Sequence, residues 1–181
     1  ALLEGHRVSV DLDLFCERMD DPEAVLQSLE DAVPELESST ISPGALDVVV
    51  DGIRVSFLRY RYPLLEPVLA VTTEVVPIAH RDDLAAMKLA AVTGRGSRKD
   101  FVDLWTLITR HDGLEHYLEC FRRKFVRRDV GHVLRSLVYF EDAELEPPLR
   151  MLADVDWTTV KADFRHWVTG LLPPSAVGPG A

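Results

Sequence analysis

The sequence predicts an α+β protein in which a small mixed β-sheet precedes a helical C-terminal half. Apolar residues recur with a period of two up to about residue 76, and with a period of roughly 3.6 from Arg81 onward. The pair Asp51-Gly52 between two β-rich runs adds a hairpin signal to the first part. Strands grouped ahead of helices are typical of α+β folds.

The first strand is predicted in the segment from Gly5 to Phe15, where apolar and polar residues alternate. A helix is expected next, because Asp20-Asp21-Pro22-Glu23 is a typical helix start and Pro34 ends the pattern. Residues 35–44 are polar and are predicted as a loop, with a short strand as the alternative.

A hairpin is predicted around Asp51-Gly52, because this pair favours a two-residue turn. A turn at this place pairs Val50 with Ile53 and sets Asp47 opposite Ser56 on one face of the sheet. A third candidate strand covers residues 71–76 and stops before Pro77.

The second half of the chain is predicted to be helical. The expected helices cover residues 81–94, 97–110, 114–127, 130–143 and 157–171. Ser97 and Asp100 resemble a capping box at the start of the second of these helices. We therefore expect a sheet region at 1–78, a helical region packed on it at 79–172, and a flexible Pro/Gly/Ala-rich tail at 173–181.

Composition narrows the class of protein. With 181 residues and 47% hydrophobic residues, the chain is long enough to bury one core. Its net charge of −10 argues against non-specific coating of nucleic acid. Cys16 and Cys120 match no metal or redox spacing, which favours free thiols in a reducing cytoplasm. No apolar run approaches the ~20 residues of a membrane span, so we expect no membrane association and a cytoplasmic location.

The pair Asp11 and Asp13 is the first candidate for chemistry. Because strand side chains alternate between faces, both carboxylates point to the same side. Such a pair on a rigid strand suits a magnesium ion or an ion pair. The alternative is a solvent-facing strand whose acids are simply hydrated.

A second candidate is an anion site in the helical half. Lys88 is the one charged residue between Leu84 and Val92, so it either extends to solvent or faces an anion. The segment from Gly94 to Asp103 combines two glycines, three bases and a helix start, which favours phosphate binding. An ordinary charged turn between helices is the alternative.

A basic segment and an acidic segment follow. Six bases lie between Arg122 and Arg135, with Asp129 as the one acid among them. They suit an RNA backbone or nucleotide phosphates. The alternative is a solvated helix face or a surface that pairs with acidic neighbours. Tyr139-Phe140 precedes three acids, which we interpret as a structural feature.

Three blocks, taken in order and spacing, resemble the AbiEii-type nucleotidyltransferase toxin family. They are Gly5-His6-Arg7-x-Ser9-x-Asp11-Leu12-Asp13-Leu14-Phe15, then Ala86-Met87-Lys88-Leu89-Ala90-Ala91, then Arg95-Gly96-x-x-Lys99-Asp100-Phe101-x-Asp103-Leu104. The segment from Tyr139 to Glu144 also resembles a late block of the short members. The resemblance covers roughly Gly5 to Trp157.

The resemblance implies a minimal nucleotidyltransferase fold that transfers a nucleotide from an NTP to an acceptor, in some members a tRNA, and that a neighbouring antitoxin protein restrains. It implies that Asp11 and Asp13 hold Mg²⁺ on the triphosphate and that Lys88 contacts the nucleotide phosphates. It further implies a second block of the site, formed by Arg95, Lys99, Asp100 and Asp103. Arg7 and Ser9 would flank the first block, and nucleotide binding is implied for them as it is for Arg95, Lys99 and Asp100.

The chain departs from the superfamily pattern in two places. No Gly-Ser or Gly-Thr element stands ahead of Asp11, and Ser56 occupies a strand position where many members carry an acid. Asp47 is the expected third catalytic carboxylate, with Glu74 as the alternative. These departures leave a second reading open, namely a catalytically inactive relative that binds a nucleotide or a protein partner.

Overall fold

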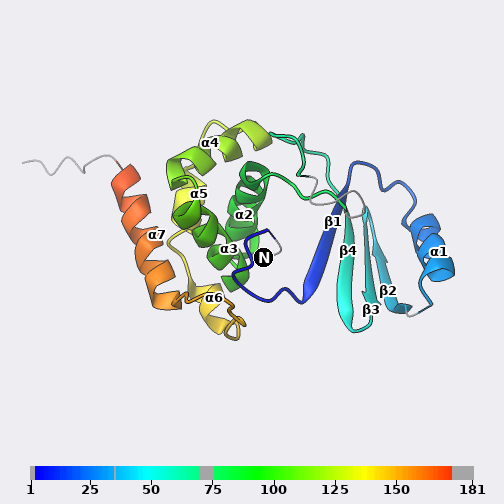
Figure 1. Cartoon of the computed structure of the whole chain (residues 1–181). Helices are drawn as coiled ribbons and strands as arrows, with labels where there is room; N and C mark the ends of the chain where they lie inside the picture. Colours follow the sequence, from blue (N-terminus) through cyan, green and yellow to red (C-terminus); the bar gives the residue numbers. More distant parts are fainter. Residues whose placement is uncertain (1–2, 35, 70–75, 173–181) are drawn as a thin grey trace, which may run out of the picture. The chain divides into compact units, whose positions relative to one another are not determined.

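The computed structural model describes residues 3–34, 36–69 and 76–172. The chain forms two compact units, of which one is Ser9–Tyr62 and the other contains the residues before Ser9 and after Tyr62 (Figure 1). This division differs from the boundary expected near residue 78. The difference arises because the backbone amides of Leu65 and Glu66 donate to Asp83, at 3.0–3.2 Å, which ties the segment after Tyr62 to the helices.

The unit Ser9–Tyr62 contains a four-stranded mixed sheet, which confirms the predicted α+β class. Its elements are β1 (Asp11–Cys16), α1 (Pro22–Ala32), β2 (Leu36–Ser42), β3 (Ala45–Val50) and β4 (Ile53–Arg59). The strand order is β1-β4-β3-β2, with β1 parallel to β4 and the other pairs antiparallel. The short strand left as an alternative for residues 35–44 is present as β2.

The β3–β4 hairpin has the predicted register. Asp51 and Gly52 both have positive φ angles, of 49° and 70°, as a two-residue turn of this kind requires. Val50 pairs with Ile53, and Asp47 pairs with Ser56. Because the pleat alternates, this register places Asp47 and Ser56 on the same face of the sheet.

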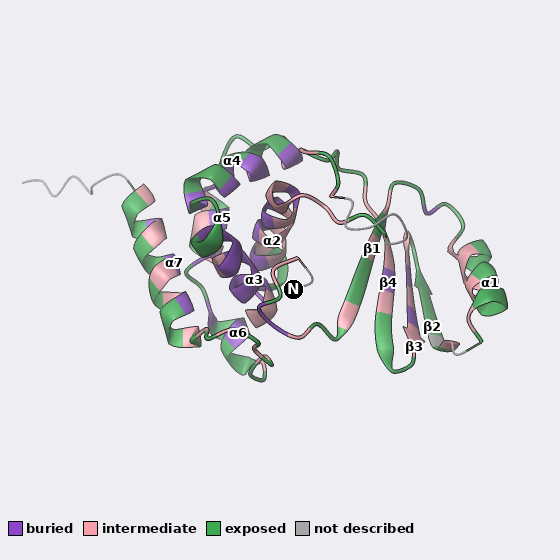
Figure 2. Ribbon diagram, in the orientation of Figure 1, coloured by how far each residue is buried: buried purple, intermediate pink, exposed green. Residues whose placement is uncertain are grey.

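The second unit is helical. Its helices are α2 (Arg81–Arg95), α3 (Arg98–Arg110), α4 (Leu114–Phe125), α5 (Gly131–Ser136), α6 (Glu141–Leu145) and α7 (Trp157–Leu171). Figure 2 shows buried residues along α2, α3 and α4, whereas α1 carries none. The core centres on Leu89, Phe101 and Phe164, which are fully buried. No described helix is long and apolar enough to cross a membrane.

Two sequence predictions about the helices were wrong in detail. The helix expected over residues 130–143 is divided into α5 and α6, and Glu141 and Asp142 fall in the first turn of α6, where acids favour the helix dipole. Ser97 caps α3 without a side-chain hydrogen bond to the helix, because its hydroxyl donates to Glu146 at 3.0 Å. Asp100 has other partners, so no capping box forms.

The segment Gly5 to Phe15 is not one strand. β1 begins only at Asp11, whereas Arg7 forms an isolated antiparallel bridge with Met151 in the helical unit. Gly5 has a φ angle of 60°, and the Val8 amide donates to the Arg150 carbonyl at 2.9 Å. Backbone pairing with the segment before α7 therefore outweighs the alternating pattern in residues 5–8.

Two further predictions concern residues that the structure does not describe. Most of the candidate strand at 71–76 and all of the predicted tail lie outside the described residues.

Candidate active site

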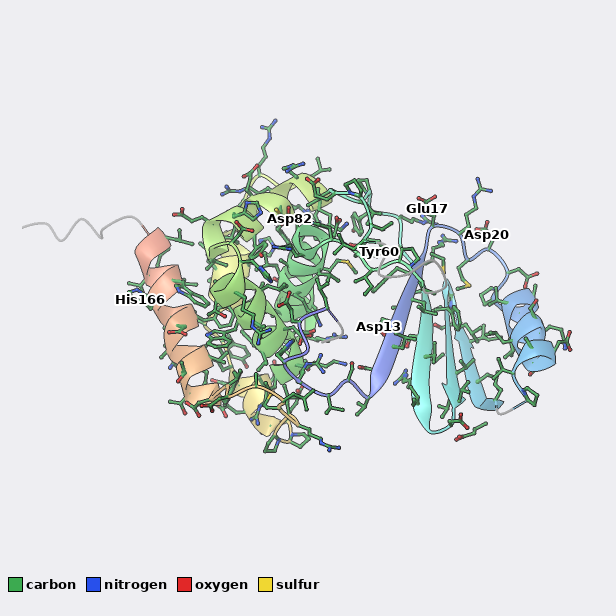
Figure 3. The ribbon with its side chains drawn as sticks, in the orientation of Figure 1. Asp13, Glu17, Asp20, Tyr60, Asp82 and His166 are labelled. Atoms are coloured by element: carbon green, nitrogen blue, oxygen red, sulfur yellow. The ribbon has the colours of Figure 1, made fainter. Side chains whose placement is uncertain are left out.

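One face of the sheet carries the acidic residues predicted from the first strand. Asp13 pairs with Ser56 across β1 and β4, and Ser56 pairs with Asp47 across β4 and β3. These three side chains therefore form one row on the same face, and Asp11 pairs with Arg54 in the next row. Asp13 is labelled on β1 in Figure 3. The sheet thus brings all three predicted catalytic carboxylates onto a single face.

Asp47 is held by two donors on β4. The Ser56 hydroxyl donates to Asp47 Oδ1 at 2.5 Å, and Arg54 Nη2 donates to Oδ2 at 2.9 Å. The Arg54 hydrogen bond, followed by that from Ser56, holds the pKa of Asp47 below its usual range. Conversely, the hydrogen bond to Asp47, followed by the charges of Asp47, Asp13 and Asp11, raises the pKa of the Arg54 guanidinium. This face therefore has a negative field that already attracts one cation.

Ser9 and Arg7, which the sequence placed together beside Asp11, fall in different units. The Ser9 hydroxyl is exposed and donates to the backbone oxygen and to Oδ1 of Asp11, at 3.1 and 3.2 Å. Ser9 thereby orients the Asp11 carboxylate. Arg7 is buried in the helical unit, where it joins a cluster of opposite charges.

Asp103 on α3 is the first centre of that cluster. Arg7 donates to both of its oxygens, from Nε at 2.7 Å and from Nη2 at 2.8 Å. His6 Nε2 and Lys88 Nζ lie 2.8 and 2.7 Å from the same carboxylate. Burial alone would raise the pKa of Asp103, but the hydrogen bonds of His6 and Arg7 and the charge of Lys88 hold it far below its usual range.

Asp100 is the second centre. Lys88 donates to its Oδ1 at 2.8 Å, and Arg95 donates to its Oδ2 from Nε at 2.7 Å. Burial would raise the pKa of this fully buried carboxyl, but Arg95 and Lys88 lower it. For Lys88 itself, burial lowers the pKa and the two aspartates raise it further than burial depresses it. Lys88 thus bridges two ionised carboxylates and stays protonated.

The cluster has a net positive charge, because three cations face two carboxylates. The Arg95 side chain is 57% exposed and that of Lys88 is 24% exposed, so both reach the surface, while Asp100 and Asp103 beneath them are buried. Side chains of cations that are held by buried carboxylates keep their orientation before a ligand binds. Such preorganised cations are suited to phosphate oxygens. The predicted residues Lys88, Arg95 and Asp100 are therefore brought together.

The predicted phosphate site at the start of α3 is not formed by the helix terminus itself. Glu146 occupies that position, since its Oε2 accepts hydrogen bonds from the Arg98 amide and the Ser97 hydroxyl, at 2.9 and 3.0 Å. Lys99 lies half-buried in the first turn of α3. The exposed positive charge of this block lies instead on the side chains that pair with Asp100, namely Lys88 and Arg95.

Sequence reasoning missed two members of these groups. His6 is almost fully buried against Asp103, and no local pattern relates residues 97 positions apart. Arg54 could have been found, since it stands two residues before Ser56 on the predicted strand and so shares its face.

The basic segment also needs a correction, because Lys124 is fully buried and pairs with Asp83 at 2.5 Å. Its arginines, by contrast, lie exposed: Arg122, Arg123, Arg127, Arg128 and Arg135.

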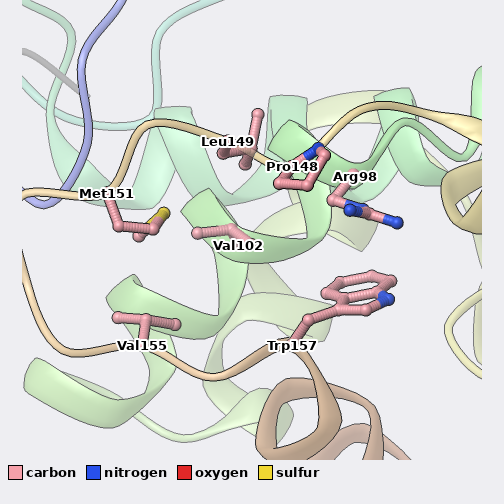
Figure 4. Close-up of a pocket in the computed structure, with 7 residues that line it drawn as sticks. All are labelled: Arg98, Val102, Pro148, Leu149, Met151, Val155 and Trp157. Carbon is pink, nitrogen blue, oxygen red and sulfur yellow. The ribbon is translucent and has the colours of Figure 1, made fainter.

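A small apolar pocket lies elsewhere in the helical unit (Figure 4). The Arg98 guanidinium lies 5.2 Å from the centre of the Trp157 ring at this pocket. Its lining consists of Arg98, Val102, Pro148, Leu149, Met151, Val155 and Trp157. None of the predicted site residues lines it, so the candidate chemistry lies on the charged groups and not in this pocket.

Comparisons with known proteins show the family of the chain. The family model described as "Nucleotidyl transferase AbiEii toxin, Type IV TA system" matches residues 60–169. A relative from Aquifex aeolicus (strain VF5), the uncharacterized protein aq_aa25, is 35% identical over 169 residues, which cover 91% of this chain and 80% of the relative. The family match includes Lys88, Arg95, Asp100 and Asp103. The chain therefore belongs to the AbiEii family of nucleotidyl transferase toxins of type IV toxin–antitoxin systems.

Proposed function

We propose that this protein transfers a nucleotide from an NTP to an acceptor in a Mg²⁺-dependent reaction, and that it does so in the cytoplasm as the toxin of a toxin–antitoxin pair. Membership of the AbiEii family supports the reaction class. Two groups of side chains support the assignment of the site residues. One group is the three carboxylates on one face of the sheet, and the other is the cations that Asp100 and Asp103 hold in place.

The acidic face has the donor chemistry that Mg²⁺ prefers. Asp11 and Asp13 supply carboxylate oxygens from alternate positions of one strand, and hard oxygen ligands suit this ion. The raised pKa of Arg54, caused by Asp47, Asp13 and Asp11, supports a field that favours cations here. We assign Asp11 and Asp13 as the metal ligands and Asp47 as the third carboxylate. When bound, Mg²⁺ neutralises charge on the triphosphate.

The cation cluster of the helical unit is proposed to bind the nucleotide phosphates. Lys88 and Arg95 would donate to phosphate oxygens, while Asp100 keeps both side chains in place. Arg7 acts one step further away, because its bidentate bond to Asp103 fixes the carboxylate that also holds Lys88. Lys99 in the first turn of α3 adds a further positive charge, and Ser9 orients Asp11.

The reaction is proposed to proceed by attack of an acceptor hydroxyl on the α-phosphorus of the NTP. A new P–O bond forms to the acceptor, the bond to the bridging oxygen breaks, and pyrophosphate leaves with the electron pair. Asp47 is our candidate for the base that receives the hydroxyl proton. Its lowered pKa keeps it ionised at neutral pH, and the same hydrogen bonds from Arg54 and Ser56 make it a weaker base.

An RNA such as tRNA is the acceptor that we propose. The five exposed arginines of the segment around α4 and α5 support it, since phosphate backbones bind such groups. Because these arginines would contact RNA phosphates, RNA binding should weaken steeply as the salt concentration rises.

An antitoxin protein is the second partner that we propose, since it follows from the proposed role as a toxin.

The test is incubation of the protein with α-labelled NTPs, Mg²⁺ and total RNA. We expect label in RNA, and its loss in Asp13→Asn, which keeps the size of the side chain and removes its charge. Glu17→Gln is the matched control, an acid just beyond β1 that is assigned no role. Transfer that is unchanged in Asp13→Asn would contradict the assignment.

A second function has one observation in its favour. Arg54 already neutralises Asp47, and Ser56 stands where an acid is expected, which suits a catalytically inactive protein that binds a nucleotide or a protein partner. The same experiment separates the two functions. Binding of NTP without transfer of label supports the inactive form, whereas transfer excludes it.

A further inference from the structure

A second cluster, built from none of the residues proposed for transfer, joins α2 to α4. Asp82 lies in the first turn of α2, directly after the cap residue His80, and is labelled in Figure 3. His116 and Cys120 lie one turn apart on α4. His116 Nε2 is 3.1 Å from Asp82 Oδ1 and 3.5 Å from Cys120 Sγ. One ligand atom from each of the three lies within 4.8 Å of the other two.

These residue types also occur in cysteine-dependent hydrolases, but the geometry here is different. In a nucleophile–histidine–acid triad, the acid and the nucleophile contact different ring nitrogens. In this cluster both Asp82 and Cys120 face the same atom, Nε2 of His116. A nucleophilic role is therefore excluded.

A metal ion explains why a sulfur, a ring nitrogen and a carboxylate oxygen converge. In a tetrahedral zinc site with bonds of about 2.0–2.3 Å, neighbouring ligand atoms lie roughly 3.3–3.6 Å apart. The separations of His116 Nε2 from Asp82 Oδ1 and from Cys120 Sγ, 3.1 and 3.5 Å, are close to this range. Small shifts of the side chains would therefore suffice to admit an ion.

The charges around the sulfur also favour a cation. Asp82, Asp83 and Asp112 all add negative potential at Cys120, and Arg123 opposes them. Asp83 is offset by its buried partner Lys124. A divalent ion bound by one thiolate and one carboxylate is neutral as a group, so the bound ion adds no net charge near the core.

We propose that Asp82, His116 and Cys120 bind one Zn²⁺ ion, with water as the fourth ligand. Thiolate and imidazole select zinc over Mg²⁺ or Ca²⁺, which prefer oxygen alone. The His116 side chain is 45% exposed, so solvent reaches the ion, whereas Cys120 is 98% buried and anchors it from the core side. Zinc takes the place of the thiol proton, which is released to solvent. The ion fixes the start of α2 to α4, independently of nucleotidyl transfer.

The test uses the untagged full chain, reduced and freed of metal with a chelator, and titrated with Co²⁺ as a spectroscopic substitute for zinc. One equivalent of Co²⁺ should produce the visible bands of a tetrahedral ion and a thiolate-to-cobalt band in the near ultraviolet. Zn²⁺ should displace it. Absence of the thiolate band in the native sequence overturns the proposal.

Variants localise the site. His116→Ala removes an exposed side chain and should keep the fold, yet it should weaken Zn²⁺ binding by at least about 10–100-fold, the loss typical of changes merely around a metal site. Cys120→Ser should abolish the thiolate band. Cys16→Ser and His166→Ala are the matched controls, since both change the same residue types elsewhere (His166 is labelled on α7 in Figure 3). The proposal fails if His116→Ala binds as tightly as the native chain, or if Cys16→Ser, and not Cys120→Ser, removes the band.

Discussion

Arg7 and Asp103 form a buried bidentate ion pair although they stand 96 positions apart in the sequence. Arg7 Nε and Nη2 reach the two carboxylate oxygens at 2.7 and 2.8 Å. Because Lys88 contacts the same carboxylate, the pair fixes one of the cations proposed to bind phosphate. The short segment before β1 thereby contributes a residue to the ion-pair cluster of the helical unit.

Asp103→Asn should destabilise the helical unit by about 3–5 kcal/mol, because it leaves Arg7 buried without its ionised partner. Urea unfolding followed by tryptophan fluorescence measures this unit alone, since Trp105, Trp157 and Trp167 all lie in it. Glu119→Gln is the control, because Glu119 forms an exposed pair with Arg122 whose loss should cost below about 1 kcal/mol. Equal losses in the two variants would contradict the structural role of Asp103.

Acid should destabilise the protein through the same carboxyl. The folded-state pKa of Asp103 is depressed, so its contribution to stability is complete above the unfolded value of about 3.9 and is lost as the pH falls below that value toward the folded pKa. The free energy of unfolding, measured from neutral to acidic pH, should therefore fall less steeply in Asp103→Asn than in the native chain. If the free energy of unfolding falls equally steeply with acid in both proteins, the pKa of Asp103 is not lowered in the folded state.

Arg95→Ala should weaken NTP binding by roughly 10–100-fold, because a hydrogen bond to a charged group contributes about 1.5–3 kcal/mol. The fold should remain, since the Arg95 side chain is 57% exposed. Binding of a fluorescent nucleotide analogue checks the affinity. Arg122→Ala is the matched control, a helix arginine with an exposed ion pair, and should bind like the native chain. If both variants lose affinity to the same degree, the nucleotide recognises general positive charge and not this cluster.

Arg54→Gln should strengthen Mg²⁺ binding about fivefold at low salt. At low salt, removing one positive charge from the face that holds a divalent ion is expected to change its affinity on the order of fivefold. Arg59→Gln serves as the control, because Arg59 lies on the same strand but points to the opposite face. Calorimetric titration with Mg²⁺ gives both affinities. An unchanged or weaker affinity in Arg54→Gln would place the metal away from this face.

The parts of the structure that depend on local chemistry could be predicted from the sequence. The Asp51-Gly52 turn fixes the register of its hairpin, so the pairing of Asp47 with Ser56 followed from two residues. The limits of most helices followed from periodicity and from caps such as Asp21, whose side chain accepts from the Ala24 amide. The Asp11–Asp13 pair was found because alternation on a strand is a local property.

The parts that depend on distant partners could not be predicted. Local alternation continues through Arg7, yet its pairing with Met151 and Asp103 removes it from the strand. Likewise, Lys124 belongs to a basic run in the sequence, and only the fold shows that it is buried on Asp83. In both cases a buried ion pair between remote residues overrides a correct reading of the local pattern.

Transfer of a nucleotide by this chain is tested most directly by the position of the label on the NTP. Parallel reactions with α-labelled and γ-labelled NTP, Mg²⁺ and total RNA should give label in RNA from the α position alone, with pyrophosphate released. Asp13→Asn should give none. Transfer from the γ position would show a kinase, and absence of transfer from either position would contradict the account.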